Sequence, residues 1–251
     1  MRALILTFVL MVAMVGRVCG EMISFRNGVD GYNVQIDLSM FNYDRNDSYA
    51  SGGIRTDGTL GIDGDSVSQS AVRFNDIIGT GAGRIAPGST IQEATLTLFT
   101  RGATSTDPGS GGRISAYRLT TFWDSDSDWR TFNAGAWGGS DGVTDDGVLV
   151  STRTSGVSNT NHAPNDIDLT AAVQSWADGS SNYGVGLAFT HTNAADLASG
   201  DESLIAQDYR PLLTVSYTIP ELNVIQLIAI SGLFMLFIRT NLKSGHYDIR
   251  V

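Results

Sequence analysis

The chain has 251 residues, 42% of them hydrophobic, with 29 glycines, a single cysteine and a formal net charge of −10. This apolar content is too high for a disordered chain, and the glycines follow no collagen-like period. The negative charge argues against a nucleic-acid partner, because it would repel the phosphates.

Residues 1–20 have the composition of a secretory signal peptide. Arg2 precedes an apolar run over residues 3–15, and small residues follow as far as Gly20. A basic start, a short apolar stretch and small residues near the cleavage point are typical of this signal, and the run is short for a membrane span. A lipoprotein with lipid attached at Cys19 is the alternative. We therefore expect export, and cleavage after Gly20 would leave no cysteine for disulfides.

Residues 21–218 follow a mostly two-residue hydrophobic period, which predicts β-strands. The clearest alternating runs are residues 34–38, 94–98, 185–189 and 213–217. Each would place one face of a strand on a core, and Gly-, Asp- and Ser-rich segments separate them. Leu169, Val173 and Trp176 have helical spacing instead, which predicts one short helix with Trp176 in the core. We therefore predict an all-β, jelly-roll-like β-sandwich with one short helix.

Residues 219–251 combine a membrane segment with a basic tail. The run from Leu222 to Ile238 is almost wholly apolar, and at about 1.5 Å per residue it covers roughly 25 Å. Arg239 and Lys243 follow, which places the C-terminal side in the cytoplasm. A buried C-terminal helix would need an amphipathic face, which this run lacks. We therefore predict a transmembrane helix.

This C-terminal segment resembles a known sorting signal. Ile-Pro-Glu at residues 219–221, the apolar span and Arg239 are together similar to the PEP-CTERM signal of exported bacterial proteins. Leu222 stands where the family has a second proline, and the tail continues beyond the basic cluster. The resemblance implies a membrane-bound sorting and processing enzyme as partner. The protein would then be membrane-anchored, or reach the cell surface or extracellular matrix after processing.

Four stretches of residues 21–218 also follow one another in a recognisable order. They are residues 71–98, 117–129, 167–184 and 210–215. In this order they resemble the DNRLRE domain, a β-sandwich of secreted bacterial proteins that is similar to carbohydrate-binding modules. The resemblance implies a noncatalytic module associated with polysaccharides.

An acidic run is a candidate calcium site. Asp124, Asp126 and Asp128 alternate with serines, and carboxylate oxygens suit a hard cation. Trp129 and Gly135 occupy the positions where an EF-hand requires Gly and Glu, so an EF-hand is excluded. Two interpretations stay open: a calcium site completed by separate loops, and a solvated acidic loop between strands.

No motif indicates an enzyme. Residues 138–142 match Gly-x-Ser-x-Gly, but a nucleophile elbow needs a strand before it and a helix after it, and this copy lies in a glycine-rich loop. The two histidines of the core, His162 and His191, lack the setting of a catalytic base or of a zinc ligand set. We therefore expect no catalytic activity.

Aromatic residues are the candidates for carbohydrate binding, because sugar C–H faces stack on aromatic rings. The candidates are Trp137, Trp123, Trp129 and Tyr183. Trp137 is flanked by Ala136 and glycines, so no apolar neighbour in sequence would bury it. Trp123 and Trp129 equally suit the packing of a loop onto the sandwich.

These observations predict an exported, noncatalytic surface protein that binds polysaccharide, such as an exopolysaccharide matrix. One alternative is a structural component of the envelope or matrix that binds no glycan. Another is a polysaccharide-cleaving enzyme, although no cluster of catalytic groups can be identified in the sequence.

Overall fold

The computed structural model describes residues 20–41, 59–62, 68–100, 113–132, 142–153, 155–157, 160–189, 195–200 and 206–219. All of these except Ile219 belong to one unit, Gly20–Thr218. Among them, no helix is long and apolar enough to cross a membrane. The predicted signal peptide and the predicted membrane segment lie outside the described residues, apart from Gly20 and Ile219.

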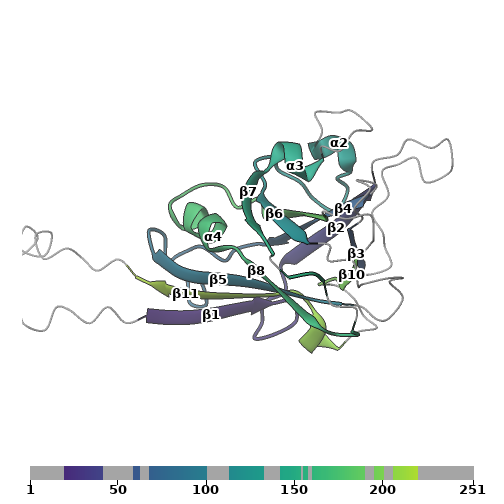
Figure 1. Ribbon diagram of the computed structural model, residues 1–251. Helices are drawn as coiled ribbons and strands as arrows, with labels where there is room; N and C mark the ends of the chain where they lie inside the picture. The colour runs from purple at the N-terminus through teal and green to yellow at the C-terminus, as the bar shows by residue number, and fades with distance from the viewer. Residues whose placement is uncertain are drawn as a thin grey trace, which may run out of the picture. The chain divides into compact units, whose positions relative to one another are not determined.

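One layer of this unit is a four-stranded antiparallel sheet in the order β1-β11-β5-β8 (Figure 1). Its strands are β1 (Gly20–Arg26), β5 (Thr90–Phe99), β8 (Pro164–Asp168) and β11 (Leu212–Thr218). Ala94, Leu96 and Leu98 are buried in β5, and so are the alternate residues Leu213 and Val215 of its neighbour β11. The alternation predicted for residues 94–98 and 213–217 is therefore confirmed.

The second layer is a five-stranded antiparallel sheet in the order β2-β4-β9-β6-β7. Its strands are β2 (Gln35–Phe41), β4 (Ser68–Phe74), β6 (Ile114–Arg118), β7 (Val148–Thr152) and β9 (Val185–Phe189). A separate two-stranded pair joins β3 (Thr59–Ile62) to β10 (Ala195–Ala198). A short 3-10 helix, η2 (Gln207–Tyr209), precedes β11. The arrangement confirms the predicted all-β class and is sandwich-like.

The main core lies between the two large sheets. It combines Leu96 and Val215 of the four-stranded sheet with Val72 and Leu187 of the five-stranded sheet. The helix α4 (Thr170–Ala177) also contributes to this core, and its Trp176 side chain is only 3% exposed. The predicted short helix and the predicted burial of Trp176 are both confirmed.

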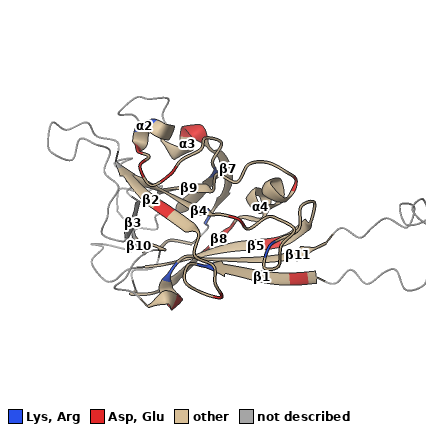
Figure 2. Ribbon diagram, turned by 180° about the vertical axis from the view of Figure 1, so that it is seen from behind, with Lys and Arg blue, Asp and Glu red and all other residues tan. Residues whose placement is uncertain are grey.

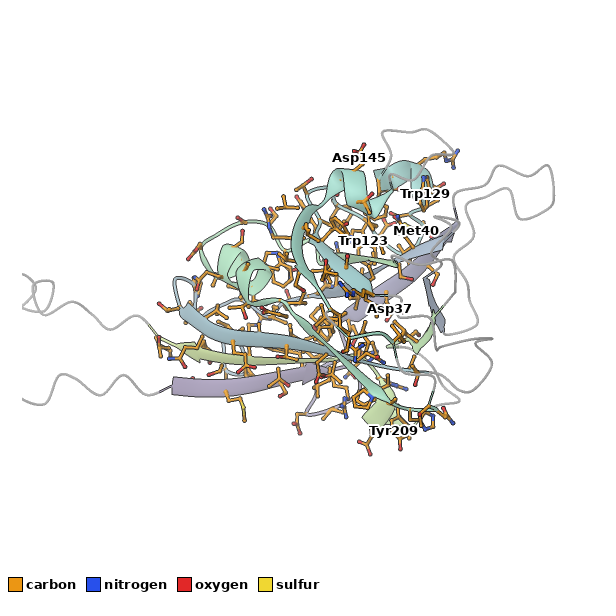
Figure 3. All side chains as sticks on the ribbon, viewed as in Figure 1. Asp37, Met40, Trp123, Trp129, Asp145 and Tyr209 are labelled. Carbon is orange, nitrogen blue, oxygen red and sulfur yellow. The ribbon has the colours of Figure 1, made fainter. Side chains whose placement is uncertain are left out.

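The outer face of the five-stranded sheet carries a second buried cluster, which we call the outer cluster. Its buried members are Leu38, Met40, Ala71, Leu119, Trp123, Trp129, Phe132, Val143 and Ala188. Several of them come from the connection between β6 and β7, which includes α2 (Trp129–Phe132) and α3 (Val143–Asp146). Trp123, Trp129 and Met40 lie on the side of the molecule that these helices cover (Figure 3). The five-stranded sheet is therefore covered on both faces.

Gly186 of β9 allows α3 to approach the sheet closely. A Cβ atom at this position would lie 2.3 Å from the Cβ of Val143, which is shorter than any normal contact. Val143 also donates its backbone N–H to Oε1 of the buried Gln69, at 2.8 Å. The helix is thus fixed to the sheet by one apolar contact and one hydrogen bond.

Replacing Trp176 with alanine should lower the free energy of unfolding by about 3–5 kcal/mol, because it removes a large buried side chain from the main core. Urea denaturation followed by fluorescence or circular dichroism measures this change. Val148→Ala, at a side chain 52% exposed on β7, is the control and should change it by less than about 1 kcal/mol. Equal effects of the two substitutions would contradict the assignment of Trp176 to the core.

Candidate functional site

The two tryptophans predicted to bind sugar are buried. Trp123 and Trp129 are each 0% exposed and belong to the outer cluster. Trp123 also donates its indole N–H to the backbone oxygen of Tyr183 at 2.6 Å. Neither ring presents a face to a ligand, so of the two roles predicted for them, sugar platform and loop packing, their burial supports packing. Trp137 lies outside the described residues.

Next to the buried Trp123, Phe122 is exposed. Phe122 has 58% of its surface accessible, and its ring makes an edge-to-face contact with Tyr183 at a centroid distance of 6.1 Å. Tyr183 itself is half-buried. Of these two rings, only Tyr183 is among the residues predicted from the sequence to bind sugar. In an extended segment, neighbouring side chains point in opposite directions, so a buried Trp123 could have indicated an outward Phe122.

Arg73 of β4 lies behind these rings. Its guanidinium carbon is 5.1 Å from the ring centroid of Phe122 and 5.0 Å from that of Trp123. The residue is 6% exposed, and no hydrogen bond or ion pair joins its side chain to another described residue. Burial lowers the pKa of Arg73, and nearby Asp124 and Tyr183 act in the opposite direction. The cation is therefore held mainly by two aromatic faces, a contact that strengthens when water is excluded.

Asp146, the last residue of α3, fixes the chain just before Phe122. Its Oδ2 accepts the backbone N–H groups of Thr120 and Thr121, each at 3.1 Å. Its Oδ1 accepts both threonine hydroxyls, and Thr120 Oγ1 also donates to the backbone oxygen of Asp146 at 2.7 Å. A carboxylate with this many donors is a strong local anchor. Phe122 is thus held in place although its ring is exposed.

Gly184 brings Tyr183 against β4 on the other side of the site. Its φ of +75° favours glycine, and a Cβ there would lie 2.3 Å from the backbone oxygen of Val72. Asn182 secures the same turn, because its Nδ2 donates to the backbone oxygen of Phe74 and its Oδ1 accepts the N–H of Gly184. Tyr183 therefore has a fixed position next to Arg73.

The three aspartates predicted to bind calcium do not converge on one point. Oδ1 of Asp124 accepts the N–H of Asp126 at 3.1 Å and so closes a turn. Oδ1 of Asp128 accepts the N–H of Arg130 at 2.9 Å at the start of α2, and its other oxygen pairs with the Arg130 guanidinium. Among the described residues, no three His, Cys, Asp or Glu side chains are grouped to hold a metal ion. The structure thus assigns Asp124 and Asp128 to a turn and a helix start.

We call Arg73, Phe122, Asp124 and Tyr183 the Phe122 site. Phe122 and Tyr183 offer apolar ring surface, while the Tyr183 hydroxyl and the second carboxylate oxygen of Asp124 can bind hydroxyl groups. Neither family models nor curated proteins give a match to this chain. The chemistry of the site is therefore the basis for assigning a function.

Replacing Asp146 with alanine should lower the free energy of unfolding by about 2 kcal/mol, since the bonds from Thr120 and Thr121 to its carboxylate are lost. Asp145→Ala is a matched control: Asp145 is the exposed neighbour in the same helix, and only its backbone is hydrogen-bonded to described residues. That control should cost below about 1 kcal/mol. Chemical denaturation compares the two, and equal losses would show that Asp146 does not anchor this segment.

Proposed function

We propose that the protein is a noncatalytic polysaccharide-binding module with a jelly-roll-like β-sandwich of the DNRLRE type. The observation that carries the proposal is the Phe122 ring, 58% exposed yet held between Tyr183 and the buried Arg73. A ring that is fixed before the ligand arrives loses little conformational entropy on binding. This is the physical requirement for an aromatic platform that stacks against sugar rings.

The charges favour neutral polysaccharides over acidic ones. Within the Phe122 site, the positive charge of Arg73 is opposed by the nearby Asp124. Over the whole chain the formal net charge is −10, and acidic side chains are spread over β1, β2 and α3 (Figure 2). An acidic glycan would be repelled at long range, whereas a neutral glycan would not.

The sequence of both ends supports a location at the cell surface. Residues 1–20 have the pattern of a signal peptide, and residues 219–251 combine an apolar span with a basic tail. We propose that the module is exported and then either held by its C-terminal membrane helix or released by a PEP-CTERM-type processing enzyme. An exopolysaccharide matrix would then be its partner.

Phe122→Ala should weaken the retention of the protein by a neutral polysaccharide about ten-fold, because an exposed platform ring contributes roughly 1–2 kcal/mol. Its melting temperature should fall by only about a few degrees, because the ring is 58% exposed and Arg73 keeps its contact with Trp123. Affinity electrophoresis in gels that contain neutral or acidic polysaccharides, run with thermal melts, measures both quantities. Met22→Ala, at a side chain 77% exposed on β1, is the control and should leave retention unchanged.

Two outcomes would contradict the proposal. One is retention that is the same for Phe122→Ala and for the unmutated protein. The other is an unmutated protein that no polysaccharide retards. A structural role in the envelope or matrix, without glycan binding, would then account better for the buried Trp123 and Trp129.

Deletion of residues 219–251 should release the exported protein into the medium in soluble form, because the apolar span would no longer hold it in the membrane. Fractionation of cells that express the full chain or the deletion variant tests this. Full-length protein found free in the cytoplasm would contradict both terminal assignments.

A further inference from the structure

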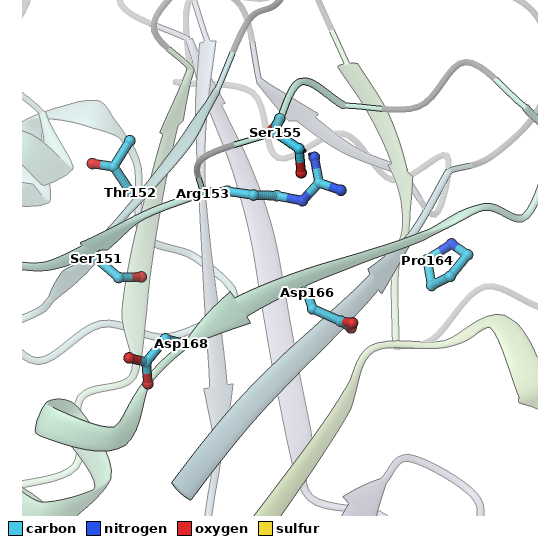
Figure 4. Close-up of a pocket in the computed structure, with 7 residues that line it drawn as sticks. All are labelled: Ser151, Thr152, Arg153, Ser155, Pro164, Asp166 and Asp168. Carbon is cyan, nitrogen blue, oxygen red and sulfur yellow. Dashed lines mark hydrogen bonds between the residues drawn. The ribbon is translucent and has the colours of Figure 1, made fainter.

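A polar pocket lies where the edges of the two large sheets meet. β7 is the last strand of the five-stranded sheet and β8 the last strand of the four-stranded sheet, and together with the residues that follow β7 they enclose about 470 Å³. The polar side chains of the lining are those of Ser151, Thr152, Arg153, Ser155, Asp166 and Asp168 (Figure 4). This volume is in the range of small-molecule sites, which is roughly 300–1,000 Å³. The pocket involves none of the four residues of the Phe122 site.

Two carboxylates on β8 supply its negative charge. Asp166 and Asp168 are alternate residues, so they project from the same face of the strand, roughly 7 Å apart along the chain. Each uses Oδ1 for a local bond: Asp166 accepts from Thr97 Oγ1 at 2.6 Å, and Asp168 from the N–H of Thr170 at 2.8 Å. The second oxygen of each carboxylate has no hydrogen bond with a described residue and is available to a ligand.

One arginine, Arg153, supplies its positive charge. Its Nη1 donates to the backbone oxygens of Ser155 and Gly156, which fixes the guanidinium at one end of the pocket. Figure 4 shows its side chain extending between Ser155 and Asp166. Burial lowers the pKa of Arg153, and Asp166 opposes that shift. Arg153 and Asp166 thus balance each other, and the charge of Asp168 is left without a counter-charge in the pocket.

Hydroxyl groups complete the lining near Asp168. Thr152 Oγ1 is 2.9 Å from Ser115 Oγ, so its orientation is fixed. Ser151 Oγ is enclosed and makes no hydrogen bond with a described residue. A buried hydroxyl without a partner is unfavourable. This end of the pocket therefore combines an unbalanced carboxylate with a polar lining.

We propose that this pocket binds a hydroxylated ligand that carries one protonated amine, namely an amino sugar with a free amino group. The ammonium group pairs with Asp168, while sugar hydroxyl groups bond to Arg153, Asp166 and the exposed Ser155. An acidic sugar would meet two carboxylates against one arginine. An N-acetylated sugar would leave the charge of Asp168 unpaired. The proposal goes beyond the polysaccharide binding assigned to the Phe122 site and does not depend on it.

Isothermal titration calorimetry of the protein with a glucosamine tetramer and with its fully N-acetylated counterpart tests this assignment. The buffer should contain enough salt to screen surface charges, at a pH where the amines are protonated and the carboxylates ionised. We expect the glucosamine tetramer to bind at least about ten-fold more tightly than the acetylated one. Asp166→Asn and Asp168→Asn should each weaken its binding by about the same factor.

Asp145→Asn is the matched control, because it removes the same charge from an exposed aspartate of α3 that does not line the pocket. This variant should leave the affinity for the glucosamine tetramer unchanged. Thermal melts establish that each variant is folded. If Asp168→Asn does not fold because its side chain accepts the N–H of Thr170 at the start of α4, the ratio of the two tetramer affinities on the unmutated protein decides. Phe122→Ala should keep the preference of about ten-fold for the free over the acetylated tetramer, even if the proposed polysaccharide site contributes to the binding of both, which separates the two sites.

Three results would overturn the proposal. The first is equal affinity for the free and the acetylated tetramer, which would remove the role of the amine. The second is an equal loss in Asp145→Asn and in the pocket variants, which would indicate unspecific attraction to an acidic protein. The third is loss of binding in the presence of a metal chelator, which would assign the carboxylates to a metal ion.

Discussion

The outer face of the five-stranded sheet is apolar and must be kept from water. The segment that covers it also determines that the Phe122 ring is exposed. The sheet carries apolar side chains on both faces: Val72 points into the main core, and its neighbour Ala71 into the outer cluster. Among the described residues, the connection between β6 and β7 supplies most of the cover of the second face, and Tyr183 packs against it from the connection between α4 and β9. The connection between β6 and β7 buries Trp123 and Trp129, and in the same stretch it turns Phe122 outward. The same connection thus both buries the two tryptophans and exposes the Phe122 ring.

Arg73 shows how a charge is accommodated in this apolar cover. Moving a guanidinium out of water is unfavourable, and no described residue compensates it with a hydrogen bond. The rings of Phe122 and Trp123 lie on it at about the same distance, so their negative faces offset part of that loss. Trp123 is buried and Phe122 is exposed, so Arg73 contacts both the interior of the outer cluster and a ring at the surface. A ligand on Phe122 would bind to a ring whose position the core already determines.

The hydrophobic period along the sequence predicts many of the strands of the sandwich. It does not predict whether the buried face of a strand packs in the main core or in the outer cluster. Residues 94–98 and the helix with Trp176 were correctly predicted, because a strand or helix with one apolar face has one solution. The alternation predicted for the run 34–38 is confirmed only in part: Val34 is 41% exposed and Gln35 is buried, while Leu38 is buried in the outer cluster and not in the main core. A pattern along one strand contains no information about a second cluster. For the same reason, the sequence leaves both a platform and a packing role open for Trp123 and does not indicate Phe122. The pocket cannot be predicted from it either, because its two sides are separate strands.

We propose that ligands bind this module at Phe122, on the ring that the outer cluster holds in place. The most direct measurement is the titration of the isotope-labelled protein with a neutral oligosaccharide, followed by backbone and aromatic NMR shifts. We expect the shifts to gather at Arg73, at residues 122–124 and at residues 182–184, while β1 and β11 on the far sheet stay unchanged. Shifts confined to the four-stranded sheet, or no shifts with any neutral oligosaccharide, would contradict it.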